Sequence, residues 1–339
     1  MLKNIIYITH AEKKPSGGAK IIYRHSEKIN SIKNFSSQVL HIKKKKISKI
    51  KLSLNKRFNF LNYKMISGWQ LKDITPVKDF KYTWFDSKVL IKENLNFNKK
   101  SDFVVIPEIF AHLADDLLIK KNIDYSIFVQ NGYVLKSSSN DELIIKAYKN
   151  SKFILSYSKN ITDCIKLKFP MLKKKIVKIS CSIPIKTKGQ KKIDLITYMS
   201  RKLPNHSNLV VDFLKNHLPK KWKIKNIDNL NEFSTYKYLN KSKIFLSFSS
   251  LEGLGLPPAE AALAGNYVIG YTGEGGKEYW SKPIFKKINN GDIITFVKET
   301  LKKINCYKKF PYNKNSLLID KFSEKNELKN IKKFLKLIK

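Results

Sequence analysis

Residues 244–280 read IFLSFSSLEGLGLPPAEAALAGNYVIGYTGEGGKEYW, and the pattern within them predicts the fold of the chain. The stretch begins with an apolar run, residues 244–248, which is typical of a buried strand. A second such run covers residues 267–271. Between them, two prolines and a run of small residues predict a short helix, because proline suits a first helical turn. Gly265 ends that helix as a C-cap. The pattern predicts one βαβ unit.

The loop between the first strand and the helix is rich in glycine. Gly253 and Gly255 allow the backbone to approach a ligand closely and to adopt positive φ angles. The helix that follows directs its N-terminal amides, with their partial positive charge, into the same space. Ligands of open α/β sheets bind at the carboxyl ends of the strands, where this loop lies. The loop therefore predicts a site for a phosphate or diphosphate.

Two carboxylates accompany the loop. Glu252 stands before the helix and Glu260 lies inside it. A carboxylate cannot bind a phosphate, but it accepts hydrogen bonds from the hydroxyls of a sugar or a ribose. The loop and the carboxylates together predict a nucleotide-sugar site. The alternative is a glycine-rich turn with a solvated Glu252 and a helix-surface Glu260.

The segment EGLGLPPAE, residues 252–260, resembles the signature of the family-4-like retaining glycosyltransferases of the GT-B fold. That signature is a Glu, seven residues and a second Glu. The resemblance implies a catalytic contact of Glu252 with the donor sugar and a ribose contact for Glu260. It also implies that the donor diphosphate is held by the amides of Gly253, Leu254, Gly255 and Leu256.

Two basic residues complete the expected donor site. The resembled family carries an Arg after the first strand of its second domain and a Lys several residues later, and both neutralise the diphosphate. Arg201 follows an apolar run at residues 194–199 and matches the first position. No Lys stands at residues 205–207, so Lys202 is the nearest substitute. A bidentate guanidinium suits a diphosphate, which makes Arg201 both a catalytic and a donor-binding candidate; the alternative is a surface arginine.

The N-terminal half begins with a second pattern of strand, loop and helix, in which Gly17 and Gly18 open the helix. In the resembled family a Gly-rich loop at this place faces the donor diphosphate, which implies donor contacts for both glycines. A polar group of the first domain, such as a His, lies near the reacting sugar in that family. His112 is the catalytic candidate, with Glu108 and Asn131 as secondary candidates. The alternative is a histidine buried in a helix.

The order of strands and helices predicts an α/β fold with parallel sheets and helices on both faces. The resemblance implies the GT-B arrangement, two Rossmann-like domains whose sheets face each other across a cleft. The expected domains are an N-terminal acceptor-binding domain, a linker, a C-terminal donor-binding domain and a C-terminal helix that crosses back to the first domain. Their bounds are 1–185, 186–192, 193–320 and 321–339.

The chain of 339 residues carries a formal net charge of +40, almost all from lysine. Scattered lysine favours a base-composition bias in the genome over a functional charge. The functional alternatives are attraction to an anionic membrane, to lipid-linked diphosphate acceptors or to nucleic acid. Proteins that recognise nucleic-acid sequence use arginine for base contacts. Arginine is scarce in this chain, which argues against nucleic acid as a partner.

The three cysteines are widely spaced, which indicates neither a disulfide framework nor a zinc site and agrees with a reducing cytosol. No stretch approaches the ~18 uninterrupted apolar residues of a membrane span. The expected location is therefore cytoplasmic, with any membrane contact made from the surface.

These patterns predict an enzyme that transfers a sugar from a nucleoside-diphosphate donor to a glycan or lipid-linked acceptor; retention is implied by the resemblance alone. No metal or other cofactor is expected, because Arg201, Lys202 and the loop amides neutralise the departing diphosphate. The alternatives are a GT-B-fold isomerase or hydrolase acting on a nucleotide sugar, a non-catalytic scaffold, and a nucleic-acid-binding protein.

Overall fold

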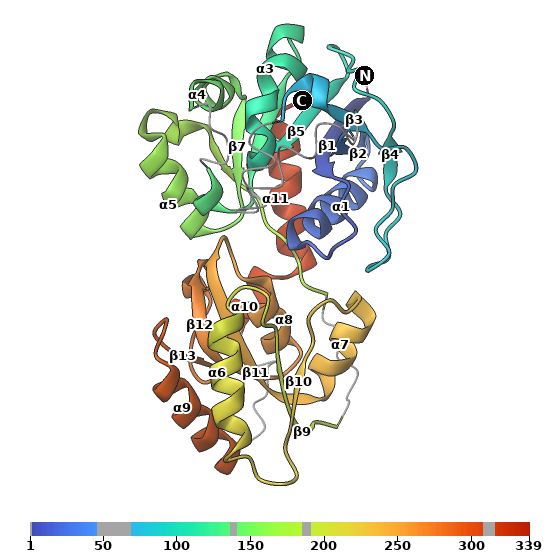
Figure 1. The fold of residues 1–339 in the computed structure, drawn as a ribbon. Coiled ribbons are helices and arrows are strands. Elements are labelled where there is room, and N and C mark those ends of the chain that lie inside the picture. Colours follow the sequence, from blue (N-terminus) through green and yellow to red (C-terminus); the bar gives the residue numbers. More distant parts are fainter. Residues whose placement is uncertain (1, 46–68, 136–140, 185–190, 308–315) are drawn as a thin grey trace, which may run out of the picture. The chain divides into compact units, whose positions relative to one another are not determined.

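The computed structural model describes residues 2–45, 69–135, 141–184, 191–307 and 316–339. The chain folds as two compact units, drawn as ribbons in Figure 1. The first comprises Met1–Tyr157, Ile161–Ile179 and Asn330–Lys339, and the second comprises Ser158–Asn160 and Ser180–Lys329. Of the predicted linker, residues 186–190 lie outside the described residues.

The first unit is built on a parallel sheet in the order β3–β2–β1–β5–β6–β7–β8, with β4 also paired to β2. Only β3 pairs antiparallel to its neighbour among the described strands. The strands are β1 (Lys3–His10), β2 (Phe35–Lys44), β3 (Ile74–Pro76), β4 (Leu90–Lys92), β5 (Asp102–Pro107), β6 (Tyr125–Val129), β7 (Phe153–Ser156) and β8 (Ile176–Lys178). The central strands β5 and β6 are buried along their whole length, as expected for strands covered on both faces.

Helices connect these strands because a parallel pair needs a crossover. They are α1 (Gly17–Asn30), α3 (Ala114–Leu117), α4 (Asp141–Asn150) and α5 (Lys159–Lys168), with 3₁₀ turns η3 (Glu108–Leu113) and η5 (Gly132–Val134). The C-terminal helix α11 (Glu324–Leu337) contributes its second half to this unit. There the fully buried ring of Phe334 lies edge-on to Phe103 of β5, with ring centroids 5.9 Å apart.

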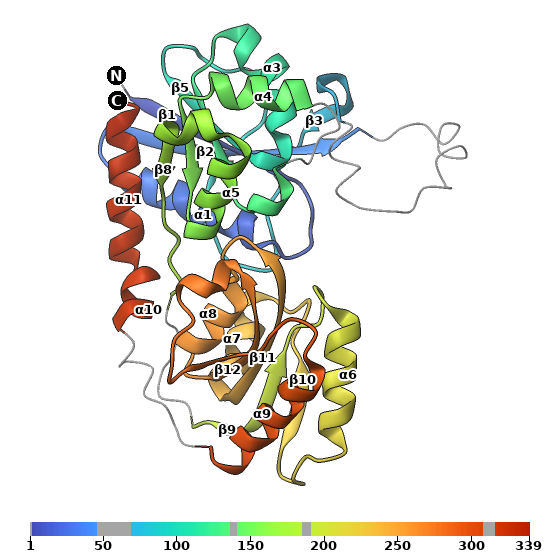
Figure 2. The ribbon, with the colours of Figure 1, turned by 90° about the vertical axis from the view of Figure 1, so that its left-hand side faces the viewer.

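The second unit holds a fully parallel sheet in the order β10–β9–β11–β12–β13. Its strands are β9 (Ile193–Tyr198), β10 (Lys223–Asn226), β11 (Ser242–Glu252), β12 (Tyr267–Glu274) and β13 (Phe285–Lys287). Its helices are α6 (Pro204–Lys215), α7 (Glu232–Lys241), α8 (Leu256–Leu263), α9 (Ile293–Asn305) and α10 (Ser316–Lys321). Helices α6 and α9 cover one face of the sheet and α7 and α8 the other (Figures 1 and 2).

The predicted βαβ unit is confirmed as β11, α8 and β12, with β11 and β12 directly paired. The core beside it is aromatic: the ring of Phe248 stacks on that of Phe296 at 5.0 Å between centroids. Gly270 of β12 has φ of +133°, and a Cβ there would lie 2.2 Å from the Ser247 carbonyl oxygen. The same Cβ would lie 2.7 Å from the ring of Phe296 on α9, so glycine at this position allows β12 to pack closely against both β11 and α9.

Within the described part of the chain, no helix combines the length and the apolar character that crossing a membrane requires.

Candidate functional site

The carboxyl ends of β9 and β11 meet at one edge of the second sheet because the two strands are parallel neighbours. Lys202 follows β9, and Glu252 is the last residue of β11. The Lys202 Nζ lies 3.2 Å from Glu252 Oε1, and the two side chains are 37% and 25% exposed. The structure thus brings together two predicted donor-site residues that are 50 positions apart, and it leaves both within reach of a ligand.

The turn that carries Arg201 and Lys202 is held by Asp228, a residue that the sequence interpretation missed. Asp228 Oδ2 accepts hydrogen bonds from the Ser200 amide at 2.6 Å, the Ser200 hydroxyl at 2.8 Å and the Arg201 amide at 3.0 Å. The side chain of Arg201 is exposed. A turn-forming Asp two residues after the end of a short strand, β10, is the sequence signal that could have identified Asp228.

The end of β11 is irregular. Its register against β12 shifts between Ser249 and Glu252, and Leu251 has φ of +48°. Left-handed backbone is uncommon for a branched residue such as leucine, and strain of this kind concentrates at functional sites. The bulge lets strand pairing continue to Glu252, whereas the sequence predicts a strand that ends at residue 248. Glu252 therefore projects from a strand end instead of from a loop.

The glycine-rich loop follows directly. Gly255 is the N-cap of α8 with φ of +75°, a conformation that favours glycine, and two prolines occupy the first helical turn as predicted. Gly253, Leu254 and Gly255 are buried, and Leu256 is half-buried. A Cβ at Gly275 would lie 2.4 Å from the Gly253 carbonyl, so the loop after β12 packs backbone against backbone on this loop.

Glu260 lies in the second turn of α8 and is half-buried. The hydroxyl of Tyr236, a buried residue of α7, lies 3.4 Å from Glu260 Oε1 and donates to it. The contact orients the carboxylate from a neighbouring helix, and nothing in the sequence pattern pointed to Tyr236. The ribose contact expected for Glu260 stays a prediction.

In the first unit, Gly17 and Gly18 are the first two residues of α1, and the Ser16 hydroxyl accepts from the Ala19 amide at 3.4 Å. The Gly18 carbonyl accepts a hydrogen bond from Gln130 Nε2 at 3.0 Å. A Cβ at Gly18 would lie 2.1 Å from Gln130 Oε1. Gln130 Oε1 is the far end of a flexible side chain, so this contact does not by itself require glycine at position 18. The donor contacts expected for Gly17 and Gly18 stay predictions.

Glu108 organises this region of the first unit. Its carboxylate is 4% exposed and accepts hydrogen bonds from the amides of Gln130 at 3.0 Å and Asn131 at 2.9 Å. Burial raises the pKa of the Glu108 carboxyl to about 7, although the amide hydrogen bonds act in the opposite direction. Glu108 thereby fixes the backbone of Gln130, and the side chain of Gln130 contacts Gly18. The carboxylate of Glu108 therefore supports the turn that Gly17 and Gly18 form.

His112 is 6% exposed and lies in the 3₁₀ turn η3 instead of in an α-helix. Its Nε2 lies 3.1 Å from the Trp69 carbonyl, so this nitrogen carries the proton and donates. Burial lowers the pKa of His112, which keeps the ring neutral. The geometry gives His112 a structural role in holding Trp69, and its catalytic role stays a prediction.

Comparison with known proteins gives no match to a protein-family model and none among curated proteins. Solved structures do match. The chain is similar to TarM of S. aureus in complex with UDP, with a TM-score of 0.64, 13% identity and 99% of each chain covered. It is also similar to the lipopolysaccharide outer core galactosyltransferase WaaB, with a TM-score of 0.60, 16% identity and 99% of each chain covered.

The chain has the GT-B fold. A third match of this fold is Alr3699/HepE of Anabaena in complex with UDP, with a TM-score of 0.62 and 10% identity, covering 98% of this chain and 99% of that chain. At these identities the similarity establishes the fold alone, so the chemistry of the site has to be argued from this chain's own residues.

Proposed function

We propose that the chain is a glycosyltransferase that moves a sugar from a nucleoside-diphosphate donor to a glycan or lipid-linked acceptor. One observation carries the proposal: Lys202 and Glu252 meet at the carboxyl edge of the second sheet, directly before the N-terminus of α8. Cation, carboxylate and helix amides at one place suit a ligand that joins a diphosphate to a sugar.

The donor diphosphate is bound by the cations and amides of this edge. Arg201 and Lys202 follow β9, and the amide of Leu256, the first residue of α8, has no partner within the helix. The two residues after Leu256 are prolines and have no N–H. Lys202 would exchange its contact with Glu252 for one with the phosphate. Glu252 is then released to accept hydrogen bonds from the sugar hydroxyls, and Glu260 from the ribose.

The reaction breaks the bond between the anomeric carbon of the sugar and the diphosphate oxygen. An acceptor hydroxyl forms the new bond to that carbon, and its proton passes to the departing diphosphate. Negative charge develops on the leaving group, where preorganised donors lower the barrier most. In this proposal Arg201, Lys202, the amides of the glycine-rich loop and the Leu256 amide supply that stabilisation without a metal. The outcome is retention, as the resemblance of residues 252–260 implies.

TarM and HepE were solved with UDP, and WaaB is described as a galactosyltransferase, which supports this function over the other classes considered. TarM was also solved with alpha-GlcNAc-glycerol, which supports a glycan-type acceptor. Peripheral contact of the lysine-rich surface with an anionic membrane belongs to the same proposal. Its test is co-sedimentation with phosphatidylglycerol vesicles against phosphatidylcholine vesicles, with binding expected for the first and lost at high salt.

A thermal-shift screen with UDP, GDP, dTDP, ADP and CMP tests the donor site. A ligand of the folded state raises the unfolding midpoint, and the same nucleotide should raise it less in Glu260→Ala and in Lys202→Ala. Glu299→Ala is the matched control, because Glu299 is 28% exposed, pairs with Lys286 at 3.0 Å and lies on α9. A screen in which no nucleotide stabilises the wild type would contradict the proposal.

Transfer itself is measured as release of the nucleoside diphosphate from the matching sugar donor, with and without acceptor and with and without EDTA. Release that depends on an acceptor identifies a transferase, whereas acceptor-independent release at full rate identifies a hydrolase. Activity that survives EDTA supports the metal-independent mechanism, and complete loss that Mg²⁺ restores would contradict it.

A further inference from the structure

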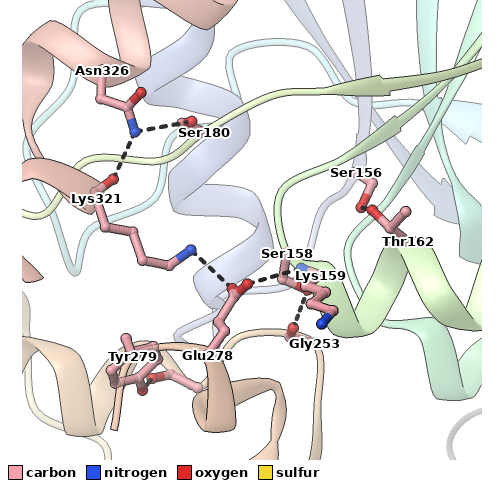
Figure 3. Close-up of polar contacts among 11 residues, drawn as sticks. Ser156, Ser158, Lys159, Thr162, Ser180, Gly253, Glu278, Tyr279, Lys321 and Asn326 are labelled. Carbon is pink, nitrogen blue, oxygen red and sulfur yellow. Dashed lines mark hydrogen bonds and ion pairs between the residues drawn. The ribbon is translucent and has the colours of Figure 1, made fainter. Parts of the chain in front are cut away.

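Two hydroxyls from distant parts of the sequence hold the backbone carbonyls of the glycine-rich loop. Ser158 Oγ donates to the Gly253 carbonyl at 2.6 Å, and Tyr279 Oη donates to the Gly255 carbonyl at 2.5 Å. Ser158 is 3% exposed and Tyr279 is 7% exposed. Both residues belong to the second unit. Figure 3 shows Ser158 reaching the Gly253 carbonyl.

Because the peptide group is planar, a hydrogen bond to a carbonyl also sets the direction of the amide of the next residue. In a planar trans peptide the carbonyl of one residue and the amide of the next point in opposite directions. The Ser158 contact therefore fixes the direction of the Leu254 amide, and the Tyr279 contact fixes that of Leu256. Leu256 is the first residue of α8, so its amide has no partner within the helix.

The segment that carries Ser158 is itself fixed to the loop after β12. The Lys159 amide donates to Glu278 Oε2 at 2.9 Å, and Lys321 Nζ lies 2.9 Å from Glu278 Oε1 (Figure 3). Glu278 ends the turn η7 (Gly275–Glu278), whose first residue packs against the Gly253 carbonyl. The segment of Ser158 and the turn that precedes Tyr279 are thus joined through Glu278.

We propose that Ser158 and Tyr279 are positioning residues, whose hydroxyls orient the Leu254 and Leu256 amides toward the diphosphate of the donor. The inference rests on the proposed function and adds residues that the signature segment 252–260 does not contain. Neither residue touches the diphosphate in this scheme. Burial raises the pKa of the Tyr279 phenol, so the hydroxyl stays protonated and keeps donating.

The test removes each hydroxyl by itself. Tyr279→Phe and Ser158→Ala are compared with two controls that remove a buried hydroxyl of the same kind in the first unit. Tyr125→Phe removes a hydroxyl that donates to the Ala147 carbonyl at 2.5 Å, and Ser37→Ala removes one that donates to the Ile5 carbonyl at 2.9 Å. Ser158→Thr keeps the hydroxyl and serves as rescue.

Binding is measured for UDP by calorimetry and for uridine by an NMR titration, at fixed ionic strength. If the thermal screen selects GDP, dTDP or ADP, that diphosphate and its nucleoside are used. We expect the Kd for the diphosphate to rise about tenfold in Tyr279→Phe and Ser158→Ala, because each variant weakens a hydrogen bond from a backbone amide to a charged group. The Kd for the nucleoside, which lacks the diphosphate, should change less than twofold. The control variants and Ser158→Thr should bind both probes as the wild type does.

The outcomes separate this inference from the function on which it rests. If the wild type binds none of the diphosphates, the proposed function itself is contradicted. A wild type that binds UDP, with both hydroxyl variants binding it equally well, leaves the function standing and overturns the positioning role. Equal loss of UDP and uridine affinity also overturns it, because general damage to the fold affects both probes. If Tyr279→Phe does not fold, Ser158→Ala against Ser158→Thr decides the question.

Discussion

The buried carboxylate of Glu108 should make the stability of the first unit depend on pH in a way that one substitution removes. Glu108 is 4% exposed and accepts the amides of Gln130 and Asn131. The proposed perturbation is Glu108→Gln, which keeps the shape of the side chain and a carbonyl acceptor but has no proton to titrate. Its effect is measured as the difference in unfolding free energy between variant and wild type at each pH.

The sign and size of this difference follow from the raised pKa. The carboxyl has a pKa of about 7 in the folded chain, against an ordinary value of 4.5. Between these two values the folded state keeps a proton that the unfolded state has lost, so the unfolding free energy of the wild type falls as pH rises through this window. The difference in pKa corresponds to about 3 kcal/mol. We therefore expect the unfolding free energy of Glu108→Gln, relative to that of the wild type, to rise by about 3 kcal/mol between pH 4.5 and pH 7.5.

Urea unfolding followed by tryptophan fluorescence measures this difference. Of the four tryptophans, Trp69 and Trp84 lie in the first unit, so Trp222→Phe and Trp280→Phe restrict the signal to that unit. Comparing variant with wild type at each pH cancels the titration of every other group. The reasoning would be refuted if the difference in unfolding free energy did not change with pH. It would also be refuted if the wild type became more stable relative to the variant as pH rises.

Three further predictions follow from the packing. Gly275→Ala should destabilise the second unit by about 1–3 kcal/mol, because a Cβ would lie 2.4 Å from the Gly253 backbone; an unchanged urea midpoint would show that the two loops separate easily. Burial lowers the pKa of the fully buried His41 to about 4, so its contribution to stability is complete above pH 6.5 and is lost as pH falls toward 4. His41→Gln should flatten the wild-type curve in that window by about 3 kcal/mol, and parallel curves would contradict this. Phe334→Ala should destabilise the first unit by about 3–5 kcal/mol in urea unfolding, since its ring is fully buried, whereas an effect below 1 kcal/mol would mean that α11 docks without it.

Local patterns in the sequence were sufficient to predict the central βαβ unit. Apolar runs marked β11 and β12, the two prolines marked the start of α8, and Gly265, with φ of +80°, marks its end. These signals are local because proline and glycine restrict the backbone of their own residue. The bulge at Leu251 was missed, since no residue type signals that a strand continues past a polar pair.

The contacts of the site were less predictable. The sequence interpretation proposed donor roles for Glu252, from its place beside the glycine-rich loop, and for Lys202, from a family resemblance. Their pairing depends on β9 and β11 being neighbours. The contact between Gly18 and Gln130, which are 112 residues apart, was not predicted, and the donor contact expected for Gly18 stays a prediction. Packing partners so far apart in the chain leave no mark in the composition or periodicity around either residue.

The sequence by itself therefore determined the α/β class, the position of the glycine-rich loop and the residue types available at the strand ends, because those depend on local backbone preference and burial. Only the tertiary structure decided which hydroxyl holds which carbonyl: Ser158 and Gly253 are 95 residues apart in the chain and form a hydrogen bond within the second unit. The physical reason is that a hydrogen bond acts over about 3 Å, whereas the sequence specifies local conformation, and distances between remote residues are set by how the elements pack.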